Sequence, residues 1–271
     1  MIGPDPDADL AAVSAQRDQF GLPVGAPVAE WTARPLPPRT PLRGRYCRLD
    51  PVDVERDSRQ LYEAYATAPD HRDWTYLPAS GFDDHESYRQ HLAAQAGAAD
   101  PMHHTITDLA LGRAVGTAAL MRIDPDNGVI EVGHITYSPL IQRTRAGTEA
   151  MYLLMRRVFD ELGYRRYEWK CDSLNAPSRT AALRYGFQFE GIFRKAVVYK
   201  GRNRDTAWFS IVDDEWPGIK DGFEAWLAPA NFDSAGRQLR PLAVRPADPR
   251  STETPTAPGL QVAGRASVDL G

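Results

Sequence analysis

The segment Glu131–Thr148 carries residues that suit a bound phosphate. It reads EVGHITYSPLIQRTRAGT, a strand-like stretch that ends in a turn with arginines and small residues. Apolar residues at helical spacing follow, so the turn opens into a helix, whose free N–H groups and dipole favour a pyrophosphate. Arg143 and Arg145 add charge-assisted donors, while Ala146 and Gly147 let a phosphate approach the backbone. The segment therefore predicts a phosphate-binding turn.

A second segment, Asn175–Phe187, has the pattern of a short helix with a polar start. It reads NAPSRTAALRYGF. Asn175 suits the N-cap, Pro177 suits the first turn, where no N–H is needed, and Ser178 places a hydroxyl beside them. These features alone describe an ordinary helix start. Their occurrence after the first segment, with one strand between, favours a shared ligand site.

Hydrophobic periodicity predicts the elements that position these segments. Helices are expected over Pro51–Thr67, Asp83–Gly97, Thr144–Leu162 and Ala176–Tyr185, and a final amphipathic segment over Trp216–Leu227. Strands are expected over Met102–Asp108, Arg113–Arg122, Val129–Tyr137, Tyr167–Asp172, Phe187–Lys200 and Thr206–Asp213. This order predicts a mixed α/β domain with an antiparallel hairpin first and a crossover later.

The ends of the chain differ from its middle in composition. Residues 1–41 are expected to form a short helix, Asp7–Phe20, and a proline-rich extended arm. Residues 42–227 are expected to form the folded domain. Residues 228–271 contain few large apolar side chains, so they are expected to form a disordered tail.

The composition excludes several function classes. The net charge of -4 argues against a generic nucleic-acid or membrane-surface protein. Cys47 and Cys171 stand far apart, which favours buried, reduced thiols and gives no metal site. The N-terminus lacks the basic and apolar regions of a signal peptide, and no apolar run approaches a membrane span. A cytoplasmic protein is expected.

Together the two segments resemble the GNAT superfamily of acetyltransferases, and most closely its ribosomal-protein and small-molecule N-acetyltransferase branch. The resemblance covers roughly Arg43–Trp216. It implies one domain with a mostly antiparallel central sheet flanked by helices, and acetyl-CoA as the co-substrate. In this family a Gln/Arg-x-x-Gly-x-Gly/Ala turn binds the CoA pyrophosphate, and a downstream Asn-x-x-Ser/Ala helix lines the pantetheine and thiol. The cofactor-binding residues implied are Ile135, Thr136, Tyr137, Gln142, Arg143, Thr144, Arg145, Ala146, Gly147, Thr148, Asn175 and Ser178.

The implied reaction is direct attack of an amine on the thioester carbonyl. The amine must lose a proton, the oxyanion needs N–H donors, and the thiolate must gain a proton. Glu131 is the expected general base, directly or through water, and Ser178 the expected donor to the thiolate. An N–H near Ile135 or Thr136 is expected to polarise the thioester. His134 is not favoured, because alternation places it on the opposite face of the strand from Glu131.

The sequence departs from the family pattern at two positions. Arg145 stands where the turn motif has its first glycine, so it either adds a phosphate contact or reshapes the turn. Ala182 stands seven residues after Asn175, where many members place a catalytic tyrosine. Tyr185 lies further along the same helix and is expected to be a core residue. The usual tyrosine acid is therefore not supplied.

Trp74 and Tyr76 lie between the first two expected helices and are expected to form one wall of the acceptor pocket. The expected partners are an amine, from a small molecule or a peptide N-terminus, and a second copy of the chain in a homodimer. One alternative is a catalytically weak CoA-binding sensor or scaffold. Another is an RNA- or ribosome-binding protein that uses Arg143, Arg145, Arg202 and Arg204, although the net acidity counts against it.

Overall fold

The computed structural model describes residues 16–244, and the chain divides into two units after Ala33. The described part of the first unit contains an antiparallel pair, β1 (Gln16–Arg17) and β2 (Pro23–Val24). The carboxylate of Asp18 accepts from the N–H groups of Phe20 and Leu22, which fixes the turn between them. The helix expected over Asp7–Phe20 is therefore wrong from residue 16 onward, and its earlier part lies outside the described residues.

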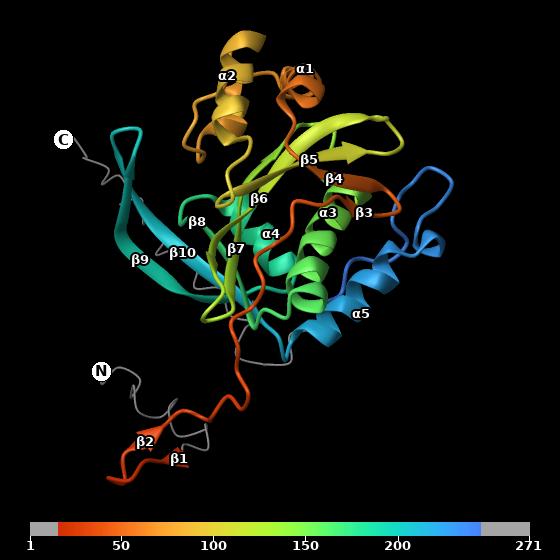
Figure 1. Ribbon diagram of the computed structural model, residues 1–271. Coiled ribbons are helices and arrows are strands. Elements are labelled where there is room, and N and C mark those ends of the chain that lie inside the picture. The colour runs from red at the N-terminus through yellow and green to blue at the C-terminus, as the bar shows by residue number, and fades with distance from the viewer. Residues whose placement is uncertain (1–15, 245–271) are drawn as a thin grey trace, which may run out of the picture. The chain divides into compact units, whose positions relative to one another are not determined.

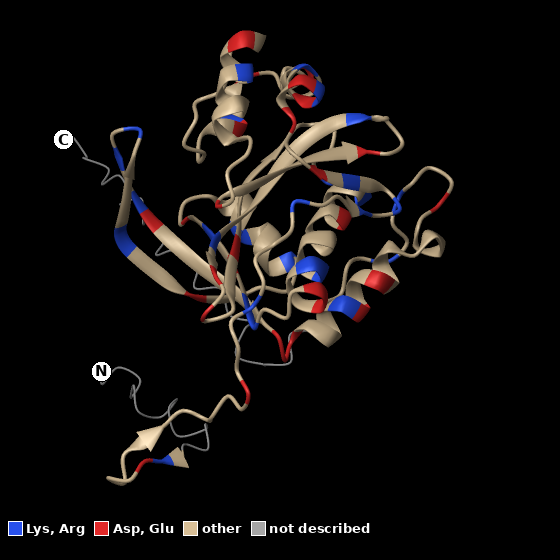
Figure 2. Ribbon diagram, in the orientation of Figure 1, with Lys and Arg blue, Asp and Glu red and all other residues tan. Residues whose placement is uncertain are grey.

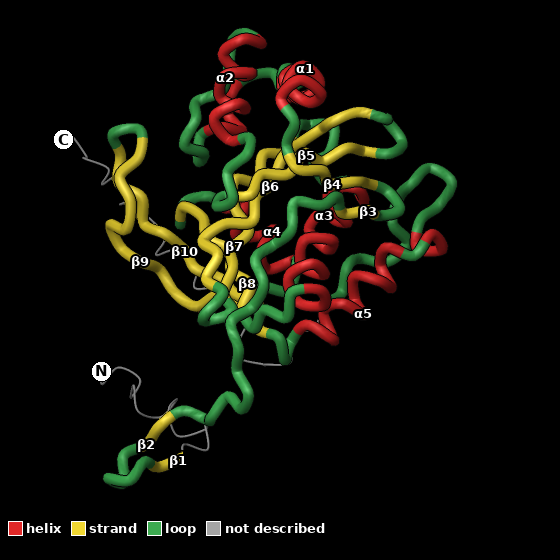
Figure 3. The backbone as a smooth tube through the Cα atoms, in the orientation of Figure 1, coloured by secondary structure: helices red, strands yellow, loops and turns green. Residues whose placement is uncertain are grey.

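The second unit is built on an eight-stranded sheet in the order β3-β4-β5-β6-β7-β8-β10-β9 (Figures 1 and 3). Its strands are β3 (Leu42–Arg43), β4 (Cys47–Pro51), β5 (Met102–Asp108), β6 (Arg113–Asp124), β7 (Val129–Tyr137), β8 (Arg166–Asp172), β9 (Gln188–Tyr199) and β10 (Arg202–Val212). Neighbouring strands are antiparallel except β7 and β8, which are parallel because a helical crossover joins them. The predicted mixed, mostly antiparallel sheet is confirmed.

Five α-helices flank this sheet in the described part of the chain. They are α1 (Val54–Tyr65), α2 (His85–Gln95), α3 (Arg145–Arg156), α4 (Ala176–Arg184) and α5 (Trp216–Leu227). The helices α1 and α2 pack together beside β6, whereas α3 contacts α5 and β4, and α4 contacts β8 (Figure 1). The hydrophobic core is correspondingly divided into a large cluster with α3, α4 and α5 and a smaller one beneath α1 and α2.

Local sequence signals explain where the helices begin and end. Asp53 caps α1, Asp84 caps α2 and Asn175 caps α4, each accepting from a backbone N–H of the first turn. Beyond α3 the chain continues through a wider turn, Arg157–Glu161, to Gly163, whose φ of 68° ends the helical stretch. The stripe of apolar residues predicted for this helix is buried, as are both cysteines.

Part of the segment expected to be a tail is folded. The Asn231 amide donates to the carbonyls of Trp226 and Arg240, and Phe232 packs edge-on against Trp226 at 5.1 Å between ring centroids. Val244 lies against Gly186. Residues 228–244 thus extend the domain beyond Leu227, and residues 245–271 lie outside the described residues. Within the described range, no helix has the length and apolar character to cross a membrane.

Candidate active site

The parallel strands β7 and β8 separate and leave an opening in the sheet. Their pairing runs from Val129–Arg166 to Val132–Trp169 and stops, although β7 continues to Tyr137 and β8 to Asp172. In the same part of β7, two residues stand opposite one residue of β6, and His134 has a φ of 48°. This β-bulge redirects the strand. A cleft of about 1660 Å³ is lined by residues from both diverging strands and from the start of α3.

The structure brings the two candidate segments together in this cleft. All the residues predicted to bind the cofactor line it: Ile135, Thr136, Tyr137, Gln142, Arg143, Thr144, Arg145, Ala146, Gly147, Thr148, Asn175 and Ser178. The Ser178 hydroxyl accepts from the indole N–H of Trp169 at 3.0 Å. Because the indole occupies a lone pair of this oxygen, the Ser178 proton is left to donate elsewhere.

The turn before α3 is closed by side-chain and backbone hydrogen bonds. The Thr144 hydroxyl accepts from the N–H of Gly147 at 3.1 Å and donates to the carbonyl of Ile141 at 2.8 Å. A Cβ on Gly147 would meet that carbonyl oxygen at 2.7 Å, so the close approach requires glycine. Arg145 is the first residue of α3, where ordinary helical backbone makes a glycine unnecessary, and its guanidinium lies over the ring of Tyr46.

Glu131 does not reach the cleft. Its carboxylate is buried and lies 3.0 Å from the ammonium of Lys170 and 2.8 Å from the guanidinium of Arg122. Lys170 also contacts Glu168 at 2.6 Å and lies 3.7 Å from the ring centroid of Trp208. These two ion pairs hold the carboxylate outside the cleft, so it is not placed to take a proton from an amine there.

The expectation that His134 faces away from Glu131 is wrong. His103 pairs with Ala119, and Ala119 pairs with Gly133, so His103 shares a sheet face with Gly133 and Glu131. The His134 ring lies 5.1 Å from that of His103 and therefore on this face. The bulge breaks the alternation by inserting one residue. Burial and then the charge of Arg122 lower the pKa of His134.

The aromatic loop before α2 divides its side chains between the core and the cleft. Trp74 is buried and packs edge-on against Tyr65 and Phe82, each at 5.3 Å between ring centroids. Trp74 does not line the cleft, so we no longer propose that it forms a wall of the acceptor pocket. Tyr76 does line the cleft, and its hydroxyl donates to the carbonyl of Leu174 at 3.2 Å.

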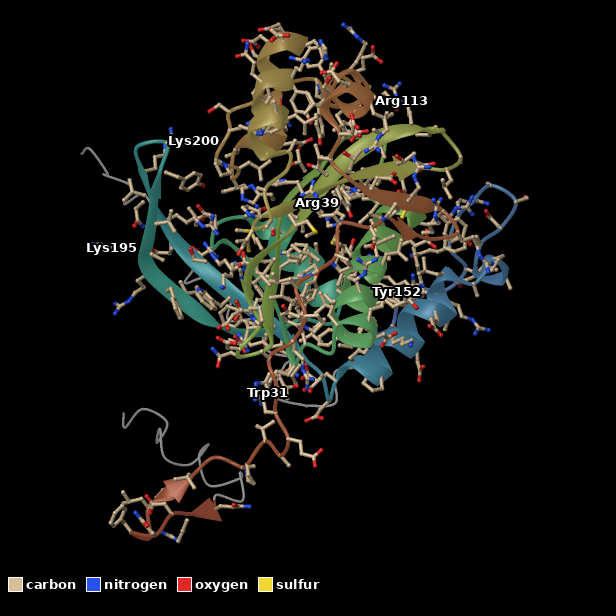
Figure 4. All side chains as sticks on the ribbon, in the orientation of Figure 1. Trp31, Arg39, Arg113, Tyr152, Lys195 and Lys200 are labelled. Atoms are coloured by element: carbon tan, nitrogen blue, oxygen red, sulfur yellow. The ribbon has the colours of Figure 1, made fainter. Side chains whose placement is uncertain are left out.

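Two further contacts hold this loop beside the opening. The ammonium of Lys200, at the end of the β9–β10 hairpin, donates to the carbonyl of Trp74 at 2.8 Å (Figure 4). The side-chain amide of Gln142 donates to Asp73 at 3.0 Å. Loop, hairpin and turn are therefore linked around the mouth of the cleft.

The sequence patterns did not identify several of the residues that line the cleft. They are Tyr46, Trp169, Arg184, Trp226, Phe232 and Arg237. Arg184 stands in a helix already assigned to the site, so its position near the helix end was an available signal. The others come from the residue before β4, from β8, and from α5 and the segment after it, and no local pattern reveals that these parts meet. Over the described residues, no group of three or more His, Cys, Asp or Glu side chains is arranged to hold a metal.

Comparison with known proteins identifies the family. Residues 47–188 match the family model described as an acetyltransferase (GNAT) domain. The chain therefore belongs to the GNAT family and is an acetyltransferase of the class that uses acetyl-CoA.

Two solved structures are similar to the whole folded unit. A GCN5-related N-acetyltransferase from Brucella melitensis is 48% identical, with a TM-score of 0.78, over 79% of this chain and 97% of that chain. A probable acetyltransferase of the GNAT family from Chromobacterium violaceum ATCC 12472 is 39% identical, with a TM-score of 0.67, over 72% and 98%. An uncharacterized N-acetyltransferase p20 from Bacillus licheniformis is 32% identical over 108 residues, 38% of this chain and 58% of the relative.

Proposed function

We propose that this protein transfers the acetyl group of acetyl-CoA to a primary amine, of a small molecule or a peptide N-terminus, by direct attack. The observation that supports it most is the continuity of one cleft from the β7–β8 opening to the start of α3. Acetyl-CoA has a thioester at one end and a pyrophosphate near its middle. It therefore needs a cleft that joins a site for the thioester, at the opening in the sheet, to a site for the pyrophosphate, at a helix start. The N–H groups at the α3 start and Arg143 would hold the pyrophosphate.

The test is acetyl transfer by the full-length chain. Release of CoA thiol is measured with acetyl-CoA and a panel of primary amines and short peptides. Thiol release that requires both acetyl-CoA and an amine is the expected result. Tight CoA binding without turnover across the panel would contradict the proposal and favour the sensor or scaffold reading. A complex with RNA that survives moderate salt would favour a nucleic-acid function, although basic and acidic residues are interspersed along the chain (Figure 2). The cytoplasmic location and the homodimer stay predictions.

We assign protonation of the leaving thiolate to Ser178, whose orientation Trp169 fixes. Ser178→Ala removes this donor, and kcat is expected to fall about 10- to 100-fold while the Kd for acetyl-CoA changes little. Steady-state kinetics and calorimetric titration measure the two quantities. Thr180→Ala, in the same helix and lining the same cleft, is the matched control and should retain near-wild-type kcat. Unchanged kcat in Ser178→Ala would contradict the assignment.

We assign proton acceptance from the amine to His134 acting through a water molecule, in place of Glu131, because His134 does not itself line the cleft but the next residue, Ile135, does. His134 precedes Ile135 in the bulge, and its lowered pKa keeps the ring neutral near neutral pH. A base works only when unprotonated, so kcat should fall as the pH drops through this pKa, which lies below the ordinary 6.5. His134→Gln is expected to lower kcat about 100-fold and remove this acidic limb. If the His134→Gln variant kept the acidic limb of the pH profile of kcat, that limb would belong to another group and the assignment to His134 would be wrong.

A further inference from the structure

The lining of the cleft includes a guanidinium that lies over two aromatic rings. The guanidinium carbon of Arg145 lies 4.4 Å from the ring centroid of Tyr46 and 5.4 Å from that of Phe232. All three side chains line the cleft. Tyr46 immediately precedes β4, whereas Phe232 follows α5. Parts of the chain that are far apart in sequence therefore meet at Arg145. The rings fix the position of the guanidinium and leave N–H groups for a ligand.

Arg184 has a similar setting at the end of α4. Its guanidinium carbon lies 5.3 Å from the ring centroids of both Tyr185 and Trp226. It also donates to the hydroxyl of Thr148 in the first turn of α3 at 3.2 Å. These residues line the same cleft as Arg145. Arg184 therefore stands beside the start of α3, where Arg145 begins the helix.

The charge of these arginines is not neutralised by carboxylates. Among residues 16–244, neither Arg145 nor Arg184 lies within ion-pair distance of an Asp or Glu side chain. By contrast, Arg237, which also lines the cleft, pairs with Asp233 at 2.8 Å. Two ordered guanidiniums without carboxylate partners suit an anion with several oxygen acceptors, such as a phosphate monoester. Such a group is close to a dianion at neutral pH.

The order of the groups within CoA indicates which phosphate would lie near these arginines. With the thioester at the β7–β8 opening and the pyrophosphate at the turn before α3, the next part of CoA is its nucleotide. We infer that Arg145 and Arg184 bind the 3′-phosphate of the CoA ribose, and that the segment Trp226–Gln238 completes this site. The inference rests on the proposed function. It gives the Arg145 departure from the family turn a specific role in selecting the phosphorylated cofactor.

Two contacts fix the position of the segment Trp226–Gln238. Trp226 donates its indole N–H to the side-chain carbonyl of Gln238 at 2.9 Å and packs edge-on against Phe232. Both rings that reach the arginines from this segment lie outside the residues matched by the family model, which end at 188. The C-terminal segment therefore adds two aromatic rings to arginines that lie within the matched region.

Calorimetric titration of the full-length chain with CoA and with dephospho-CoA tests the inference. The wild type is expected to bind CoA at least about tenfold more tightly, because two charge-assisted contacts are lost without the 3′-phosphate. In Arg184→Gln and in Arg145→Gln this ratio should fall, and in the double variant it should approach one, while the Kd for dephospho-CoA stays near its wild-type value. Adenosine 3′,5′-bisphosphate should bind the wild type more tightly than adenosine 5′-diphosphate.

The control variant is Arg156→Gln. Arg156 also lies over an aromatic ring, that of Tyr152 at 5.8 Å, but it does not line the cleft, so the CoA preference should be unchanged. Equal wild-type affinities for CoA and dephospho-CoA would overturn the inference and leave the acetyltransferase proposal intact. The inference would also be overturned if the arginine variants bound CoA and dephospho-CoA more weakly by the same factor. Failure of the wild type to bind either CoA form or to transfer acetyl groups would instead overturn the proposed function.

Discussion

Lys170→Met is expected to lower the free energy of unfolding by about 3–5 kcal/mol. Lys170 is buried between the carboxylates of Glu131 and Glu168, at 3.0 and 2.6 Å. Methionine has a similar length but no charge, so it leaves two buried carboxylates close together. Arg122 still contacts Glu131 and Arg166 still contacts Glu168, but neither arginine bridges these two carboxylates as Lys170 does.

Chemical denaturation at neutral pH measures this effect. Lys220→Met is the matched control, because Lys220 pairs with Asp160 at 2.7 Å with about a third of each side chain exposed, and its loss should cost less than about 1 kcal/mol. Adding Glu131→Gln to Lys170→Met should recover part of the stability by removing one of the stranded charges. Equal stabilities for Lys170→Met and Lys220→Met would contradict the prediction.

Glu149→Gln is expected to lower the free energy of unfolding by about 2–4 kcal/mol. The buried carboxylate of Glu149 accepts from the backbone N–H groups of Arg45, Tyr46 and Cys47 at 2.8, 2.6 and 2.8 Å. It thereby ties the start of β4 to α3. A glutamine replaces one acceptor oxygen with an NH₂ group that faces backbone donors, so at least one of these N–H groups loses its partner. Gly44 lies so close to this carboxylate that an added Cβ would collide with it.

The same change should also weaken cofactor binding, because Tyr46 lines the cleft and supports the guanidinium of Arg145. Thermal and chemical denaturation measure the first effect, and titration with CoA measures the second. Glu224→Gln is the control: Glu224 is exposed and accepts from the Tyr152 hydroxyl at 2.8 Å, so its loss should cost less than about 1 kcal/mol. A Glu149→Gln protein as stable as this control would contradict the prediction.

Much of the fold was predictable because its signals are local. The strands β5 and β7 have the predicted bounds, and the caps Asp53 and Asn175 act within a single helical turn. The turn before α3 was predictable for the same reason, since its small residues and arginines are contiguous; its binding of the cofactor stays a prediction. The helix expected at Asp7–Phe20 failed from residue 16 onward because the Asp18 carboxylate engages nearby N–H groups in a turn instead.

The positions of the catalytic candidates depended on tertiary structure. Glu131 is the third residue of the expected strand, but the neighbouring strand β8 supplies Lys170, which forms a buried ion pair with its carboxylate. Trp74 stands in a loop that looked exposed, yet it fills the core beneath α1 and α2. Sequence patterns show which residues alternate on a strand. They do not show which strand lies beside it or what that strand contributes.

The sequence by itself thus determined the family, the element order and the residues of the turn before α3. Tertiary structure decided that the β-bulge sets His134 on the same face as Glu131, and that Arg145 meets Tyr46 and Phe232. The physical reason is the range of the forces involved. Periodicity, caps and turn preferences act over a few residues, whereas strand pairing, buried charge and aromatic packing join residues far apart in the chain.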